Sequence, residues 1–163
     1  MHGRKKLYLA GPDVFRDNAK EHFDLLKRLS EQYGMEGISP FDSDVQMGTS
    51  GEIFRTNVSI MDRVDAIIAN IVPFRGIGVD DGTAFELGYG FAKGLKLYGY
   101  SRTFSKTYEE IAGAYPMLVN EEYPLLEGFG QTCNLMIAEA ILERGGNIFE
   151  SFEECLIHYK NSF

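Results

Sequence analysis

An apolar run that leads into a glycine-rich loop and a helix start constrains this chain more than any other stretch. Residues 66–72 carry six apolar side chains and one asparagine, which is typical of a strand buried on both faces of a parallel sheet. Pro73 and the glycines at 76 and 78 end this strand, and Asp80 or Asp81 is a good N-cap for a helix from about 82 to 93. This order favours an α/β fold with its ligand site at the carboxyl ends of the strands.

The rest of the chain repeats the alternation of short strands and amphipathic helices. Its 163 residues suit a single domain, residues 1–163. We predict a doubly wound α/β domain, Rossmann-like or flavodoxin-like, with a five-stranded parallel sheet and helices on both faces. The other predicted strands are 7–10, 35–39, 96–100 and 147–150, and the other helices begin at 17 or 18, 51, 108, 134 and 151 and end near 33, 63, 115, 144 and 160. In the helix that begins at 51, the apolar face comprises Ile53, Phe54, Val58 and Met61.

Composition excludes several functional classes. The formal net charge of −8 argues against a nucleic-acid polymer as partner, because phosphate binding needs clustered Lys and Arg. We find no transmembrane-length apolar run and no signal peptide, so we expect no membrane association and a cytoplasmic location. Two cysteines and three histidines have no zinc-site spacing, so no metal is expected. Dinucleotide, P-loop and GxSxG motifs are absent, and we expect no cofactor.

Carboxylate chemistry at the carboxyl edge of the sheet remains. Asp80 lies in a loop and Glu86 inside a helix, and two carboxylates in different environments can serve as proton donor and ionised nucleophile. Tyr8, at the edge of a central strand, is placed to hydrogen-bond such a nucleophile, and Phe15 or Phe41 to stack on a flat ring. The alternative is that Glu86 is an ordinary surface acid and that the aspartates only cap the helix.

Several motifs in this order resemble the nucleoside 2-deoxyribosyltransferase family. They are YLAGP with Phe15, then DAIIA from Asp65, DDGTAFELGY from Asp80, EGFG from Glu127 and NLM from Asn134. The resemblance runs from about residue 6 to residue 137. It implies exchange of the base of a 2′-deoxynucleoside for another purine or pyrimidine.

The resemblance also implies roles for three catalytic residues. Glu86 matches the nucleophile that attacks C1′ of the deoxyribose, Asp80 matches the acid that handles the proton of the base, and Tyr8 matches the tyrosine that orients the nucleophile. Asp81 doubles the acid beside Asp80, which leaves the assignment between the two open.

Five further positions correspond to substrate-binding residues of the family. Phe15 matches an aromatic residue that packs on the base, Asp44 falls where some members read the base, and Gly11 lies in the first motif. Asn57 replaces an aspartate of some members, and an amide cannot ionise. Asn134 matches an asparagine that a neighbouring subunit lends to the site, which implies a dimer-based homo-oligomer.

The expected function is transfer of the 2-deoxyribosyl group from a 2′-deoxynucleoside to a free nucleobase through a covalent deoxyribosyl-glutamate. The first alternative is a nucleoside or nucleotide N-glycosidase on the same scaffold. The second is a non-catalytic domain that binds nucleosides.

Overall fold

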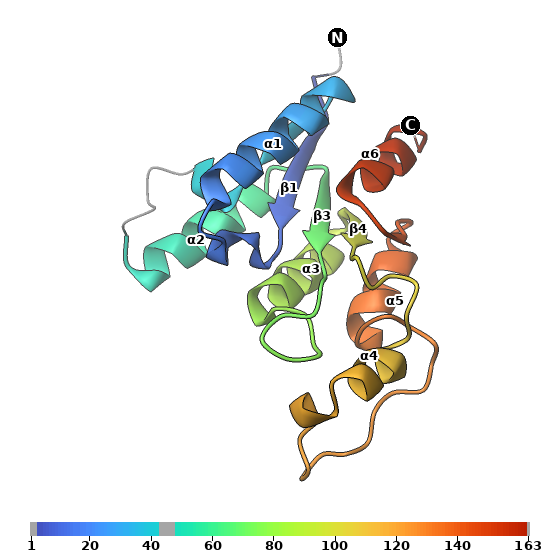
Figure 1. Cartoon of the computed structure of the whole chain (residues 1–163). Helices are drawn as coiled ribbons and strands as arrows, with labels where there is room; N and C mark the ends of the chain where they lie inside the picture. Colours follow the sequence, from blue (N-terminus) through green and yellow to red (C-terminus); the bar gives the residue numbers. More distant parts are fainter. Residues whose placement is uncertain (1–2, 43–47, 163) are drawn as a thin grey trace.

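Five parallel strands form one sheet in the order β2-β1-β3-β4-β5, which confirms the predicted fold class. The structure is a computed structural model that describes residues 3–42 and 48–162. The strands are β1 (Lys6–Ala10), β2 (Glu36–Ile38), β3 (Ala66–Asn70), β4 (Lys96–Tyr100) and β5 (Ile148–Phe149). This is the flavodoxin-like order, in which the chain changes direction between β1 and β3. Figure 1 shows the arrowheads of β1 and β3 pointing to one edge of the sheet, where the loops after β3 and β4 gather.

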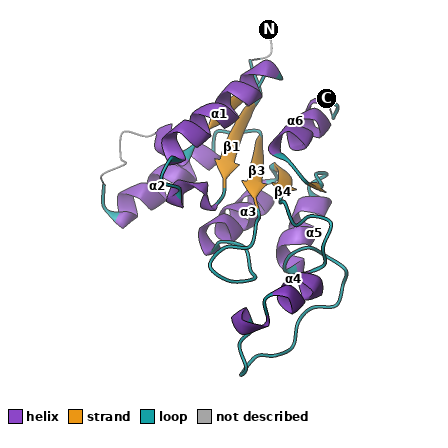
Figure 2. Cartoon of the chain, viewed as in Figure 1, coloured by secondary structure: helices purple, strands orange, loops and turns teal. Residues whose placement is uncertain are grey.

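Helices cover both faces of the sheet, as Figure 2 shows. Alternate residues along each strand point to opposite faces, so the sheet has two separate cores. Leu7 and Leu9 pack against α1 (Ala19–Gln32) and α6 (Phe152–Lys160). Tyr8 and Ile67 face the opposite core, which is closed by α2 (Ser50–Met61), α3 (Asp81–Lys93) and α5 (Leu135–Glu143).

The remaining short helices lie in the connections. The 3₁₀ helices are η1 (Pro12–Phe15), η2 (Pro40–Asp42) and η3 (Pro116–Leu118), and α4 (Tyr108–Ala114) follows β4. Figure 1 places α4 beyond the carboxyl edge of the sheet, and a long loop returns from it to α5. In the described parts of the chain, no helix combines the length and the apolar character required to span a bilayer.

Helix capping follows the local sequence. A capping box of Ser151 and Glu154 starts α6, at the predicted position, and a second box of Thr49 and Glu52 starts α2. Asp80, and not Asp81, is the N-cap residue of α3. β3 ends at Asn70, two residues before its predicted end.

The predicted apolar face of α2 is only partly buried. Met61 is buried and Val58 packs against the core, but Ile53 and Phe54 are exposed to 40% and 54%. These two residues lie in the first half of α2, and Ile53 lines a cavity instead of filling the core. The apolar periodicity of this helix therefore predicted a core face, part of which is a cavity wall in the structure.

Two glycines allow backbone segments near the candidate site to pack unusually close together. A Cβ at Gly90 would come within 2.6 Å of Ile67 Cδ1, so only a glycine lets α3 lie this close to β3. Gly11 has φ 148°, and a Cβ there would lie 2.7 Å from Asn70 Cβ. The end of β1 therefore turns directly against the end of β3, at the point where the chain changes direction.

Candidate active site

Tyr8 and Glu86 form the centre of the candidate site. The Tyr8 hydroxyl donates a hydrogen bond of 2.6 Å to Glu86 Oε1. Tyr8 lies in the middle of β1 and is fully buried, while Glu86 lies in the second turn of α3. The pair forms because Tyr8 points to the sheet face that α3 covers, and the small Gly90 brings that helix close.

Opposing effects act on the pKa of Glu86. Burial raises the pKa of Glu86 from 4.5 to about 7, and the negative charge of Asp80 also raises it, while the Tyr8 hydrogen bond lowers it. Burial, and then the neighbouring Glu86 charge, raise the pKa of Tyr8 far above its usual value. Tyr8 therefore keeps its proton and acts as a donor to the Glu86 carboxylate. The ionised and neutral forms of Glu86 are both populated near pH 7.

Asp80 is held in place as the N-cap of α3. Its Oδ2 accepts from the Thr83 backbone N–H and from Thr83 Oγ1, both at 2.9 Å. Oδ1 makes no hydrogen bond to any residue that the structure describes, so it is available to a ligand. Asp80 lines the same cavity as Glu86, whereas the adjacent Asp81 is exposed in the first turn of the helix.

A cavity of about 460 Å³ contains Glu86 and Asp80. This volume lies in the usual range for small-molecule sites. Three of the predicted binding residues, Gly11, Phe15 and Asn57, line this cavity. The wall also includes residues without a role in the sequence-based prediction: Val14, Pro40, Ile53 and Gly82, beside Phe41. Val14 and Pro40 follow the ends of β1 and β2. Their position after a predicted strand is the sequence feature that could have identified them as wall residues.

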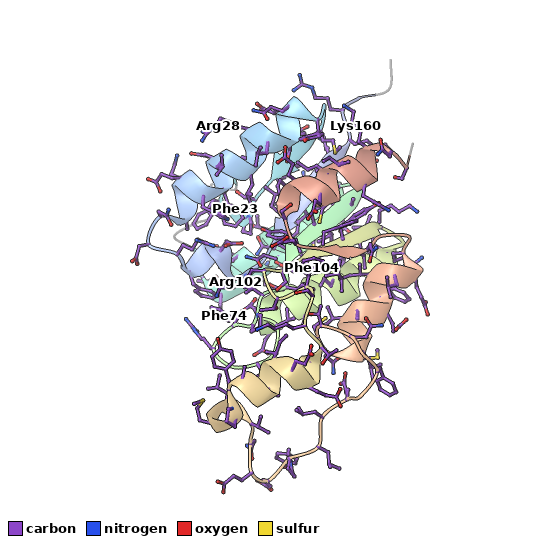
Figure 3. The ribbon with its side chains drawn as sticks, turned by 45° about the vertical axis from the view of Figure 1, so that its right-hand side comes forward. Phe23, Arg28, Phe74, Arg102, Phe104 and Lys160 are labelled. Atoms are coloured by element: carbon purple, nitrogen blue, oxygen red, sulfur yellow. The ribbon has the colours of Figure 1, made fainter. Side chains whose placement is uncertain are left out.

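Phe15 is the exposed aromatic wall of this cavity. Its ring stacks on Phe74 with a centroid distance of 5.2 Å and an interplanar angle of 17°, and the Arg75 guanidinium lies 4.8 Å and 4.7 Å from the Phe15 and Phe74 centroids. Phe15 also contributes to a second cavity of about 520 Å³, which Phe74 and Arg102 line. Figure 3 shows these two side chains on the loops beyond β3 and β4. The stack fixes the Phe15 ring as a shared wall.

A buried carboxylate fixes the segment that carries Phe15. Asp13 is only 2% exposed and accepts from Asn70 Nδ2 at 2.8 Å and from Arg16 Nε at 2.5 Å. The Asn70 bond joins η1 to the end of β3, and the Arg16 guanidinium compensates the buried charge. The geometry of the aromatic wall is therefore set by contacts outside the cavity.

Two predicted residues lie elsewhere. Asn134 is not among the cavity residues: it is the N-cap of α5 and its side chain bonds to Glu127. Asp44 lies in 43–47, outside the described residues. Within the described ranges, we find no group of three or more His, Cys, Asp or Glu side chains that could hold a metal ion.

The fold and the site together define a doubly wound α/β protein with a carboxylate pair in a cavity at the switch point of its sheet. The sequence matches the family model described as nucleoside 2-deoxyribosyltransferase over residues 7–136. The chain belongs to this family.

Three known proteins are similar to this chain. An uncharacterized protein of Schizosaccharomyces pombe is 40% identical over 117 residues, which cover 67% of this chain and 55% of that protein, so this chain spans about half its length. A 2-desoxiribosyltransferase from Leishmania mexicana has 30% identity and a TM-score of 0.78 over 96% of this chain and 97% of its own. A 2-deoxyribosyltransferase from Bacillus psychrosaccharolyticus has 19% identity and a TM-score of 0.58 over 91% and 88%, which shows the shared fold.

Proposed function

We propose that this protein transfers the 2-deoxyribosyl group of a 2′-deoxynucleoside to another purine or pyrimidine base, with Glu86 as the nucleophile. One observation carries the proposal: Glu86 lies on a substrate-sized cavity with its carboxylate held by the buried Tyr8 hydroxyl at 2.6 Å. Family membership supports the substrate class. Asp80 on the same cavity supplies the second carboxylate.

In the first half-reaction, the ionised Glu86 carboxylate attacks C1′ from the face opposite the base. The C1′–N bond breaks, its electron pair leaves with the base, and an ester bond forms between C1′ and Glu86. Asp80, in its protonated form, donates a proton to the departing base and becomes the carboxylate that accepts a proton in the second half-reaction. Deoxyribose lacks an electron-withdrawing 2′-hydroxyl, so positive charge develops more easily at C1′.

In the second half-reaction, a nitrogen of the incoming base attacks C1′ and releases the Glu86 carboxylate. The incoming base loses a proton, which Asp80 accepts. Two inversions at C1′ give net retention of configuration. Tyr8 takes no part in bond making; its hydroxyl stabilises the leaving carboxylate and orients it.

The aromatic wall supports a flat ligand. The base stacks on Phe15, which the Phe74 ring holds from behind, and Gly11 and Asn57 line the space around the sugar and base. Asp44 remains a proposed base-reading residue. The two proposed ligands, a deoxynucleoside and a free nucleobase, both carry such a flat base.

Asn134 lies outside the cavity of its own chain, so its proposed role requires a second copy. Met136 beside it is 73% exposed and Phe129 is 69% exposed, an apolar surface that a dimer would cover. We therefore include in the proposal a dimer-based homo-oligomer in which Asn134 completes the neighbouring site at the hydroxyl end of the sugar. A cytoplasmic location belongs to the same proposal.

The experiment is a panel of deoxynucleoside donors incubated with free-base acceptors, with products identified by chromatography and mass spectrometry. We expect a new deoxynucleoside and, with donor alone, a deoxyribosyl adduct on Glu86. Release of base and free deoxyribose without a new nucleoside would favour the N-glycosidase. Binding without any base release, unchanged in Glu86→Gln, would show a non-catalytic domain and overturn the proposal.

A further inference from the structure

The side-chain amide of Asn134 is held from two sides. Its Oδ1 accepts a hydrogen bond of 3.0 Å from the Met136 backbone N–H, and its Nδ2 donates to Glu127 Oε1. The first bond is the usual N-cap interaction of a helix, here α5. The second comes from the long loop between η3 and α5, orange in Figure 1. Both polar ends of the amide therefore have a fixed partner.

Glu127 also binds the start of α5 directly. Its Oε2 accepts from the Leu135 backbone N–H at 2.7 Å. One carboxylate thus satisfies a backbone donor of the first helical turn and the side chain of the N-cap residue. An acid at this end of a helix is also favoured by the helix dipole.

The charge of Glu127 decides which way the amide points. An ionised carboxylate only accepts hydrogen bonds, so the Asn134 NH₂ must face it. The reversed amide would place carbonyl oxygen against the Glu127 carboxylate and NH₂ against the Met136 N–H. Both contacts of the reversed amide are repulsive, so a single orientation is populated.

We propose that Glu127 is a positioning residue that fixes the amide of Asn134 for recognition of the sugar hydroxyl in a neighbouring subunit. This inference rests on the proposed role of Asn134. With both internal bonds made, Asn134 retains one N–H and one carbonyl lone pair for a ligand. A hydroxyl group both donates and accepts, so the fixed amide can make two complementary bonds to the 5′-hydroxyl of a deoxynucleoside.

The test uses Glu127→Gln, which keeps the size of the side chain but places an NH₂ where an acceptor stood. We expect kcat/KM for a 2′-deoxynucleoside to fall between about tenfold and a hundredfold, mostly through KM. Rates are also measured with the matching 2′,5′-dideoxynucleoside, which lacks the hydroxyl. Preference for the normal donor should shrink in Glu127→Gln and in Asn134→Ala to a similar level.

The double variant distinguishes positioning from general support of the fold. If Glu127 acts through Asn134, adding Glu127→Gln to Asn134→Ala changes kcat/KM by less than about twofold. Glu127→Asp keeps both acceptor oxygens and should retain more of the hydroxyl preference than Glu127→Gln. Glu109→Gln is the control, because Glu109 lies beside Gly128 in the same region and has no bond to Asn134.

Two results would overturn the inference, and they distinguish failure of the Glu127 role alone from failure of the Asn134 role. If Asn134→Ala lowers activity but the loss from Glu127→Gln is fully retained in the double variant, Glu127 does not act through Asn134 and only this inference fails. If Asn134→Ala keeps wild-type kcat/KM and hydroxyl preference, the proposed role of Asn134 fails with it. Transfer activity of the wild-type protein is measured in the same series, so loss of the whole proposed function is separately visible.

Discussion

Tyr8 and Glu86 are joined by a 2.6 Å hydrogen bond although 78 residues separate them in the chain. The bond connects the central strand β1 to helix α3, and it places a phenol donor under a carboxylate that burial would otherwise keep neutral. Desolvation, which favours the neutral acid, is thereby opposed by one strong hydrogen-bond donor, which favours the carboxylate. This balance determines how the proposed nucleophile responds to pH.

Tyr8→Phe should move the acid limb of the pH profile. The Tyr8 hydrogen bond lowers the pKa of Glu86. Its loss therefore raises that pKa, and the ionised nucleophile forms only at higher pH. We expect kcat/KM to fall about tenfold to a hundredfold at pH 6 and less at pH 8. A pH profile that keeps the wild-type midpoint would contradict this role of Tyr8.

Glu86→Ala and Glu86→Gln should lower the transfer rate by about 10³-fold or more, because neither side chain can form the ester with C1′. Initial rates of base exchange measure the loss. Glu143→Gln, on the exposed end of α5, is the matched control and should keep wild-type activity. Equal activity of Glu86→Gln and the control would exclude covalent catalysis by Glu86.

Asp80→Asn should separate capping from proton transfer. The asparagine oxygen can still accept from the Thr83 backbone N–H, so the melting temperature should change less than in Asp80→Ala. Activity should nevertheless fall about 10²-fold, because an amide cannot carry the proton of the base. Removal of the Asp80 charge also lowers the pKa of Glu86, a shift opposite to that of Tyr8→Phe.

Asp81→Asn is the control for Asp80→Asn, because this neighbouring acid is exposed at the start of α3. It should retain activity within about twofold, since its charge lies outside the cavity. A larger loss in Asp81→Asn than in Asp80→Asn would reverse the assignment of the acid.

Glu86→Gln should stabilise the fold in a pH-dependent way. The pKa of Glu86 in the folded state, about 7, exceeds its usual value of 4.5. The folded protein therefore binds this proton more tightly than the unfolded chain, and the resulting stability is complete below about pH 4.5 and is lost as the pH rises through 7. Glutamine avoids that loss, so the variant should gain about 3 kcal/mol at pH 8 and little at pH 4. Denaturant unfolding at both pH values measures the difference, and an equal gain at both would disprove the linkage.

Gly90→Ala should destabilise the protein by about 1–3 kcal/mol, because the new methyl group would lie 2.6 Å from Ile67 Cδ1 and 2.9 Å from Leu97 Cδ2. Gly88→Ala is the matched variant on the same helix: nothing lies within 4 Å of its Cβ, and alanine favours a helix by up to about 1 kcal/mol. Thermal unfolding should therefore change in opposite directions. Similar destabilisation in both variants would mean that contact between α3 and the sheet is not the cause.

Local sequence was sufficient for most of the fold. The apolar run 66–72 gave β3, the Ser151–Glu154 pair started α6, and Asp80 or Asp81 marked the start of α3, because caps and buried strands depend on residues a few positions apart. Residues Ile53 and Phe54 are the exception: Ile53 lines the cavity and Phe54 packs on the Phe85 ring, and periodicity cannot distinguish such positions from a core face.

The sequence by itself determined the five-stranded α/β architecture, the approximate starts of α3 and α6 and, through its motifs, the family. Only the tertiary structure decided that Asp80 rather than Asp81 faces the cavity, that Phe15 is backed by Phe74, and that Asn134 is held by Glu127 away from its own site. The reason is physical. Caps and strands arise from neighbours along the chain, whereas the pKa of Glu86 depends on burial and on a strand partner that only packing brings within bonding distance.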